Sequence, residues 1–455
     1  MSIVTLNPAT EKKIQTYQTL DDAALEAKLK QSHAAFHTWR HSSFTKRTQL
    51  FLSLAKKLID SKKMLSETMS IEMGKPLSQG LREIEKCAWL CEHYANHAQT
   101  YLKPQKIQTD MSEAWVSYQP LGVILGVMPW NFPFWQVLRF AVPTMMAGNA
   151  VVIKHASNCL ESGEKIAHLF QEVGFEADVF SHLIINTDDV KKIIAHQAIK
   201  AVSFTGSNKG GRIIAQMAAN ELKKCVLELG GSDPYIVLAD ADLDQAAQCI
   251  VASRLNNAGQ VCVAAKRVFV AQSIYSVLID KIKQYMANYQ LGDPLNPATK
   301  LGPLARQDLR NTLDAQVKTS IQQGAKCLVG GMPVAQVGFY YQATLLIDVK
   351  PGMPAFDEEL FGPVIALSTF DTEEQAIKLA NQSEYGLGAA IFSTDLDKAK
   401  KLAEYAIESG MCFINAQVSS DPRLPFGGIK HSGFGRELAQ EGIKEFVNVK
   451  TIAVK

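Results

Sequence analysis

Cys262 has the surroundings expected of a reactive nucleophile. It ends the segment 257–262 (Asn-Ala-Gly-Gln-Val-Cys), which is small, polar and flexible and lies where one predicted element gives way to the next. A side chain in such a place can face a cleft, whereas Cys225 and Cys327 fall in apolar runs typical of buried structural cysteines. An unperturbed thiol, with a pKa of about 8.5, is only roughly 3% thiolate at neutral pH, so a reactive Cys262 needs a helper. A merely structural cysteine is the alternative interpretation.

Glu228 is the candidate for that helper. It lies between Leu227 and Leu229, at the end of an apolar run that predicts a buried strand. Burial raises the pKa of a carboxyl group because the charged form loses its hydration, which would make Glu228 a usable general base close to neutral pH. The alternative is a strand residue whose carboxylate faces solvent.

Three turns that follow apolar runs carry further polar groups. Asn131 lies in a loop fixed by Pro129 and Pro133, Gly206 and Ser207 follow the run that ends at Phe204, and Lys154 leads into Ser157. A glycine at a strand-to-helix turn lets a phosphate approach backbone amides and the positive end of a helix. The turn at Gly206 has neither a P-loop ending nor the Gly-x-Gly-x-x-Gly pattern. Each turn taken alone also fits an ordinary cap or a solvated lysine.

The elements that must position these groups alternate between strand and helix. Residues 20–100 show helical periodicity, with Asp21-Asp22 as a predicted N-terminal cap and a further helix over 45–61. Two series of short apolar strands then alternate with helices, which predicts two α/β units, each with a mostly parallel sheet, meeting near residues 230–232. The predicted strands are 123–125, 151–153, 182–185, 201–204 and 225–229, then 235–238, 267–270, 326–328, 364–368, 389–392 and 411–414.

Composition excludes several classes of protein. Lys+Arg 47 against Asp+Glu 45 gives a net charge of +2, which predicts neither a nucleic-acid partner nor a membrane surface. The longest apolar run, about 121–128, is too short to cross a bilayer, and residues 1–13 have no signal-peptide pattern. The eight cysteines form no CxxC pair and no metal-ligand spacing, so we predict no metal site and a reducing cytoplasm.

Taken together, these stretches resemble the aldehyde dehydrogenase superfamily over nearly the whole chain. The resembling segments occur in the family's order: 129–133 (Pro-Trp-Asn-Phe-Pro), Gly148-Asn149 leading to Lys154, 204–207, 227–231, 259–262, 358–363, and 425–428 running into 432–437. The resemblance implies an α/β fold with a Rossmann-type cofactor domain, an α/β catalytic domain and a small β-ribbon for oligomerisation. The implied boundaries are 1–103 with 121–231 for the cofactor domain, 232–440 for the catalytic domain, and 104–120 with 441–455 for the ribbon.

The resemblance also implies a mechanism. Cys262 would attack the aldehyde carbon to form a thiohemiacetal, and the Asn131 amide with the Cys262 backbone N–H would hold the oxyanion. Loss of hydride to a nicotinamide leaves a thioester, which water activated by Glu228 would hydrolyse.

The same resemblance implies a dinucleotide site. Its cofactor-binding residues would be Trp130, Asn131, Lys154, His155, Ala156, Ser157, Gly206, Ser207, Leu229, Glu359 and Phe361. Members that prefer NAD often have a glutamate three residues after the lysine, and here that position is Ser157. Lys154 and Ser157 can jointly bind a 2′-phosphate, so we predict NADP as the preferred cofactor, with NAD also possible.

Arg139 points to the substrate class. It resembles the carboxylate-binding arginine of succinate-semialdehyde dehydrogenases, with Trp135, Ser419, Ser420 and Phe426 as further substrate-binding residues. A structural salt bridge is the alternative for Arg139. Several members carry a second arginine six residues before the nucleophile, where this chain has Asn256. We therefore predict oxidation of succinate semialdehyde to succinate, and keep glutarate semialdehyde or a broader, NAD-preferring aldehyde range as the alternative; nearby Lys266 or Arg267 could replace the missing cation.

Three rival functions are disfavoured. A cysteine hydrolase would want a histidine base, and none of the 10 histidines lies in a matching motif. A CoA-acylating member would commonly lack Glu228, and a non-catalytic relative would not need Asn131, Glu228 and Cys262 together. The alternating tail 446–454 and the ribbon-like segment 101–118 resemble oligomerisation elements, which predicts a homodimer or homotetramer acting on a small aldehyde.

Overall fold

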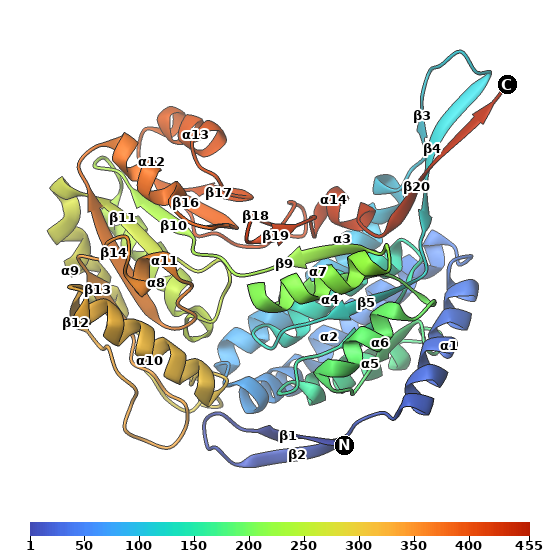
Figure 1. Cartoon of the computed structure of the whole chain (residues 1–455), viewed down its shortest axis with the longest axis horizontal. Helices are drawn as coiled ribbons and strands as arrows, with labels where there is room; N and C mark the ends of the chain where they lie inside the picture. The colour runs from blue at the N-terminus through green and yellow to red at the C-terminus, as the bar shows by residue number, and fades with distance from the viewer.

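The computed structural model describes all 455 residues and contains two mainly parallel sheets covered by helices, with a β-ribbon projecting beyond them (Figure 1). This architecture confirms the predicted α/β class. None of its helices is both long enough and apolar enough to span a bilayer.

The first sheet has the strand order β19-β9-β8-β5-β6-β7. Successive residues of its strands point to opposite faces, so Ile124 and Val151 join one apolar core while Val123 and Val152 join another. Helices α2, α3, α4 and α5 cover the first face, and α1, α6 and α7 cover the second. The elements are β5 (Val123–Val127), β6 (Ala150–Lys154), β7 (Phe180–His182), β8 (Ile199–Thr205), β9 (Lys224–Glu228), β19 (Gly433–Phe434), α4 (Pro133–Met146), α5 (Leu160–Glu172), α6 (Val190–Ala195) and α7 (Asn208–Asn220).

Three long helices and a hairpin precede this sheet: β1 (Ser2–Leu6), β2 (Lys13–Gln18), α1 (Asp22–Trp39), α2 (Phe44–Met73) and α3 (Leu77–Tyr101). Asp21 caps α1 as predicted, accepting a hydrogen bond from the backbone N–H of Ala24 at 2.8 Å. The helix expected over 45–61 is longer than predicted. No breaker interrupts it before Gly74, which ends α2 in the left-handed conformation at φ 80°.

The second sheet has the order β12-β13-β14-β11-β10-β16-β17 and is parallel except at β12. Its elements are β10 (Pro234–Val237), β11 (Arg267–Ala271), β12 (Lys326–Val329), β13 (Thr344–Ile347), β14 (Val364–Phe370), β16 (Gly388–Phe392), β17 (Met411–Ile414), α8 (Leu243–Leu255), α9 (Tyr275–Met286), α10 (Gln307–Gln322), α11 (Pro354–Asp357), α12 (Glu373–Asn381) and α13 (Leu396–Tyr405). Short 3₁₀ turns η1 (Thr187–Asp189), η2 (Asn256–Gly259) and η3 (Gln272–Ile274) join some of these elements.

The chain passes from the first sheet to the second between Glu228, which ends β9, and Pro234, which begins β10. A later segment returns: β19 pairs antiparallel with β9, with Gly433 opposite Glu228. This strand lies inside the range 232–440 that the sequence assigned to the catalytic domain, and a small sheet of β15 (Tyr385–Gly386) and β18 (Ile429–Lys430) lies just before it. The pairing of β19 with β9 joins segments about 200 residues apart in the sequence, and no local pattern reveals such a contact.

The ribbon is a three-stranded sheet in the order β20-β4-β3, formed by β3 (Gln105–Lys106), β4 (Glu113–Pro120) and β20 (Val447–Val454), with α14 (Ala439–Lys444) before β20. It extends away from both lobes and ends near the C-terminus (Figure 1). The ribbon-like segment expected over 101–118 began too early, because α3 continues to Tyr101. β20 pairs with β4 along its full length, and its other edge is free within the chain.

One strand of the first sheet lies earlier than expected. We predicted 182–185, but β7 is Phe180–His182. The N–H of Leu183 still bonds to the Ile153 carbonyl, but the Ile184 carbonyl accepts from Leu20 at the start of α1. Contact with the N-terminal segment therefore ends the strand.

Candidate functional site

A cavity of about 620 Å³ lies between α3, α4, the Cys262 loop and the segment 417–426. It brings together six residues that the sequence singled out: Cys262, Trp135, Arg139, Ser419, Ser420 and Phe426. These residues come from parts of the chain almost 300 positions apart, so their meeting in one cavity is a property of the fold.

The loop before Cys262 has an unusual backbone. Asn257, Ala258 and Gly259 all have positive φ values, of 50°, 51° and 74°. A Cβ atom on Gly259 would lie 2.0 Å from the carbonyl oxygen of Gly362, so no other residue fits there. The Asn257 side chain donates to the Asn131 carbonyl at 2.7 Å, and Gln79 accepts from the Asn257 backbone N–H at 2.7 Å. These bonds hold a strained turn that presents Cys262 to the cavity.

Cys262 is half-buried, and burial raises the pKa of its thiol to about 11. The positive charges of Arg139 and Lys266 oppose this shift, whereas Glu228 and Asp233 add to it. The backbone N–H of Cys262 donates to no acceptor within the chain. The residue thus offers a protonated thiol that needs a base, next to a free backbone donor.

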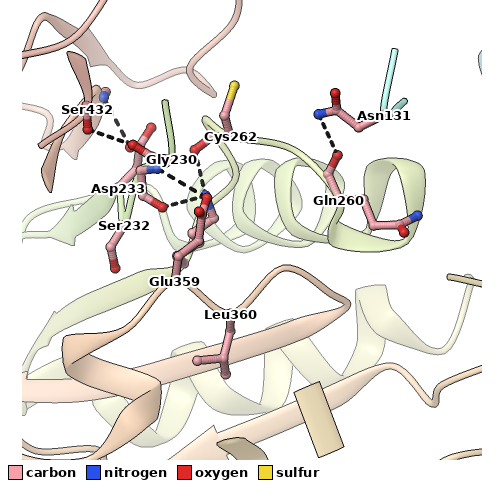
Figure 2. A network of polar contacts seen from close by, with 12 residues as sticks. Asn131, Gly230, Ser232, Asp233, Gln260, Cys262, Glu359, Leu360 and Ser432 are labelled. Atoms are coloured by element: carbon pink, nitrogen blue, oxygen red, sulfur yellow. Dashed lines mark hydrogen bonds and ion pairs between the residues drawn. The ribbon is translucent and has the colours of Figure 1, made fainter. Parts of the chain in front are cut away.

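Asn131 is buried, with 5% of its surface exposed, and lies beside the nucleophile loop. Its Nδ2 donates one hydrogen to the Gln260 carbonyl at 3.1 Å, as Figure 2 shows, and its Oδ1 accepts nothing. An amide nitrogen carries two hydrogens, so one remains for an oxyanion. The bond to Gln260 fixes the amide plane near Cys262.

Glu228 is 2% exposed, and neither of its carboxylate oxygens has a hydrogen-bond partner. Burial raises the pKa of Glu228 well above its usual value, and the neighbouring Glu437 raises it further, while Arg139 and Arg436 act in the opposite direction. The direction agrees with the shift expected from the sequence. An unpartnered buried carboxyl group is suited to exchanging a proton with a thiol or a water.

Lys266 ties the nucleophile loop to Glu359. Its Nζ donates to the Glu359 carboxylate and the Gly231 carbonyl, both at 2.5 Å, and to the Cys262 carbonyl at 2.6 Å. Figure 2 shows this network below Cys262, with the sulfur directed away from it. The backbone N–H of Gly231 also donates to Glu359, at 3.1 Å. Lys266 therefore positions Glu359 and does not line the cavity.

Arg267 does not line the cavity either. Its guanidinium donates to the backbone carbonyls of Ser232, Leu379 and Ala380 within the second lobe. The expectation that Lys266 or Arg267 replaces a second substrate-binding arginine was wrong. The Lys266 ammonium is bonded to Glu359 and to backbone carbonyls, and the Arg267 guanidinium is bonded to backbone carbonyls alone.

Arg139 forms the structural salt bridge that was its alternative interpretation, and it also lines the cavity. It lies on α4, is 1% exposed, and forms a buried ion pair with Glu437. Its guanidinium also stacks on Phe426, 4.4 Å from the ring centre, and its Nη2 has no hydrogen-bond partner. The arginine lines the cavity with a guanidinium that the chain satisfies only in part, which suits a site for an anionic ligand.

A buried ion pair fixes the start of α4. Glu83 accepts hydrogen bonds from the backbone N–H groups of Phe134 and Trp135, both at 3.0 Å, and pairs with Lys75. A carboxylate at a helix N-terminus satisfies free donors and favours the helix dipole. This arrangement orients α4, and with it Trp135 and Arg139.

The turn after β6 fits a dinucleotide phosphate. Lys154 is 8% exposed, burial lowers its pKa, and no neighbouring acid opposes that shift. Ser157 is exposed three residues later. A buried lysine without an acidic partner beside a free hydroxyl suits an anionic ligand such as a 2′-phosphate.

The turn after β8 lies at the same edge of the sheet, separated from this site by one strand, because β5 lies between β8 and β6. Ser207 caps α7 by accepting from the Gly210 N–H at 3.2 Å, which leaves its own O–H free to donate. The N–H of Gly206 bonds to the Glu228 carbonyl at 3.0 Å, so this turn is fixed to the strand that carries the candidate base.

The remaining predicted cofactor residues surround these turns. Trp130 and Phe361 pack edge to face, with ring centres 5.7 Å apart. The ring nitrogens of His155 bond to the Pro133 carbonyl and the Ala156 N–H, so neither nitrogen of the ring remains for a ligand. Leu229 donates its N–H to Ser432.

Sequence reasoning missed four residues of the site. Lys86 lines the cavity, Asn257 and Gln260 hold the nucleophile loop and the Asn131 amide, and Glu437 pairs with Arg139. Glu437 lay within a quoted motif, and Asn257 and Gln260 lay within the Cys262 segment, but their partners are distant in sequence. Lys86 carried no local signal, because a lone lysine on a helix normally faces solvent.

Comparison with known proteins points to one family. The aldehyde dehydrogenase family model matches residues 1–452. The chain is 45% identical over 452 residues to a probable succinate-semialdehyde dehydrogenase (NADP(+)) of Synechocystis, covering 99% of each. It is 42% identical over 449 residues to a succinate semialdehyde dehydrogenase (NAD(P)+) of Escherichia coli K12, covering 99% of this chain and 97% of the other. A crystal structure of succinic semialdehyde dehydrogenase from Streptococcus pyogenes in complex with NADP+ superposes with a TM-score of 0.97, at 37% identity and 99% coverage of both chains.

Proposed function

The chain belongs to the aldehyde dehydrogenase family, and from this premise we propose that it oxidises succinate semialdehyde to succinate, reducing NADP in preference to NAD. One observation carries the substrate assignment: the same cavity holds the Cys262 thiol and a guanidinium, Arg139, with a donor that no group of the chain uses. A nucleophile and an anion anchor in one cavity suit an aldehyde that bears a carboxylate.

The residues of this chain divide the chemistry between them. Glu228 takes the thiol proton as Cys262 Sγ forms a bond to the aldehyde carbon, and the new oxyanion lies against the Cys262 N–H and the Asn131 amide. Bound NADP supplies the acceptor for the hydride that leaves this carbon. Glu228 then releases the thiol proton to solvent, so that it can accept a proton from the water that attacks the thioester; the C–S bond breaks, and the electron pair leaves with Cys262 Sγ as the carboxylate product is released.

Lys154 and Ser157 carry the proposed preference for NADP. Lys154 supplies a positive charge, and Ser157 supplies a hydroxyl in place of a carboxylate that would repel a 2′-phosphate. A serine excludes nothing, so NAD remains a usable acceptor. Glu359, held by Lys266, would contact the nicotinamide ribose, with Trp130 and Phe361 beside it.

Arg139 carries the proposed preference for an ω-carboxylate. A charge-assisted hydrogen bond of about 1.5–3 kcal/mol favours such a substrate by roughly ten- to a hundred-fold over a neutral aldehyde. Ser419 and Ser420 line the same cavity and add hydroxyl donors. Glutarate semialdehyde, longer by one methylene, is the second candidate, since the cavity has a neutral Asn256 where several relatives have an arginine.

We further propose that β20 forms the subunit contact of a homodimer or homotetramer. Its outer edge is unpaired within the chain, and Val449 on it is 60% exposed. An unpaired, partly apolar edge strand is a ready template for pairing with a second chain. Residence in the cytoplasm remains a prediction from cysteine usage.

The test measures formation of reduced nicotinamide from succinate semialdehyde, glutarate semialdehyde and butanal, each with NADP and with NAD. We expect the highest kcat/KM for succinate semialdehyde with NADP. Cys262→Ala should abolish the reaction while binding NADP normally in a fluorescence titration. Equal kcat/KM for butanal and succinate semialdehyde would contradict the substrate assignment, and full activity of Cys262→Ala would contradict the mechanism.

A further inference from the structure

We propose that Lys86 is a second cation for the substrate carboxylate and that it replaces, from another helix, the arginine that several relatives carry where this chain has Asn256. The inference deepens the proposed function and rests on it. It concerns selectivity among aldehydes and leaves the bond-forming steps unchanged.

Lys86 lies on α3 and reaches into the cavity that contains Cys262 and Arg139. Its Nζ donates to the Ser420 hydroxyl at 2.7 Å and lies 4.4 Å from the centre of the Trp135 ring. Ser420 accepts through its oxygen and so keeps its own O–H to donate into the cavity. An ammonium and a hydroxyl are thereby held side by side by residues from different parts of the chain.

No carboxylate of the chain forms an ion pair with the half-buried Lys86, whereas two of the three fully buried lysines have one, Lys154 of the cofactor turn being the exception. Lys75 pairs with Glu83 and Lys266 pairs with Glu359. Taking a cation out of water is costly unless an anion compensates for it. The hydroxyl of Ser420 and the face of Trp135 compensate only in part, so the position favours an anion supplied by a ligand.

The other cations that line the cavity do not replace Lys86 as the second cation for the carboxylate. Arg82 and Lys300 are exposed at the rim, where solvent screens their charge. Arg139 is the only other cation of the wall that is withdrawn from solvent, and its charge acts against that of Lys86. A carboxylate bound to both would relieve that repulsion as well as satisfy the free Nη2 of Arg139. We therefore place the substrate carboxylate between Lys86 and Arg139.

The test compares Lys86→Met, which keeps the length of the side chain and removes its charge, with Lys86→Arg, which keeps the charge. Steady-state kinetics are measured for succinate semialdehyde and butanal with saturating NADP at neutral pH. For Lys86→Met we expect KM for succinate semialdehyde to rise by about tenfold, with kcat and the butanal KM changed by less than about twofold. For Lys86→Arg we expect KM for succinate semialdehyde to stay close to the wild-type value, because the positive charge is kept.

Lys62→Met is the matched control, because Lys62 on α2 forms a surface ion pair with Glu85, the neighbour of Lys86 on α3, and lies outside the cavity. It should leave both KM values unchanged. Equal increases in KM for both aldehydes in Lys86→Met would show a packing role and overturn the inference, as would an unchanged succinate semialdehyde KM. Failure of the wild-type enzyme to prefer succinate semialdehyde would instead contradict the proposed function itself.

Discussion

Arg139 and Glu437 form a buried ion pair between the substrate cavity and the candidate base Glu228. The arginine lowers the pKa of both Glu228 and Glu437, and it lowers the pKa of the Cys262 thiol as well. One guanidinium therefore lines the cavity and acts on the pKa values of both the candidate base and the candidate nucleophile.

The shared role of Arg139 predicts two separable effects of Arg139→Met. Loss of one partner leaves Glu437 buried without its cation, so the free energy of unfolding should fall by about 3–5 kcal/mol. KM for succinate semialdehyde should also rise much more than KM for butanal. Chemical denaturation and steady-state kinetics measure the two effects.

The double variant Arg139→Met/Glu437→Gln separates these effects. It removes the unpaired charge, so it should recover much of the lost stability without recovering selectivity for the carboxylate substrate. Joint recovery of stability and selectivity would show that Arg139 acts only through the fold.

The raised pKa of Cys262 predicts a pH-dependent thiol. Because the pKa is about 11, only a small fraction of the thiol is thiolate at neutral pH. As long as the pH stays below the pKa, this fraction rises about tenfold for each unit by which the pH increases. Alkylation of Cys262 by iodoacetamide in the free enzyme, followed by mass spectrometry, should therefore accelerate steadily from about pH 7 to about pH 9. A rate independent of pH in this range would mean that the thiolate is already formed.

Substitution of Ser157 should change the preference between NADP and NAD. In Ser157→Glu a carboxylate would lie three residues from Lys154, where it repels a 2′-phosphate and can accept hydrogen bonds from ribose hydroxyls. We expect kcat/KM with NADP to fall by at least about tenfold while kcat/KM with NAD is kept or improved. Ser157→Ala, which removes only the hydroxyl, should have a smaller effect on NADP. Parallel losses with both cofactors would place the 2′-phosphate elsewhere.

The proposed role of Lys86 predicts that the preference for succinate semialdehyde over butanal depends on pH. Burial lowers the pKa of Lys86 to about 8; the charge of Arg139 on α4 adds to this shift, and Cys87 and Glu83 on α3 and Asp421 after β17 oppose it. The ammonium is therefore present below about pH 8 and is lost above it. The ratio of kcat/KM for succinate semialdehyde to that for butanal should fall as the pH rises through this value.

The ratio cancels the titration of Cys262 and Glu228, which both substrates share. In Lys86→Arg the ratio should stay level across the same range, because a guanidinium keeps its charge. A wild-type ratio that does not change with pH would show that Lys86 does not bind the carboxylate.

Local pattern was enough for the elements and the chemistry of single residues. The β-branched runs predicted most strands of both sheets, Asp21 predicted the start of α1, and the leucines around Glu228 indicated a buried strand, from which the direction of its pKa shift followed. Each of these properties depends on neighbours in sequence, since strand pattern, capping and the burial of a strand residue repeat over a few positions.

Only the tertiary structure decided which charges meet. Sequence could not tell whether Arg139 binds substrate or a salt-bridge partner, and the fold brings Glu437 to one part of its guanidinium while leaving another part free. The fold also directs Lys266 toward Glu359 and Arg267 toward backbone carbonyls. It places Lys86 against Ser420, which lies more than 300 residues later in the sequence. Ion pairing and burial depend on distance in space, and the folding of distant segments against one another sets that distance.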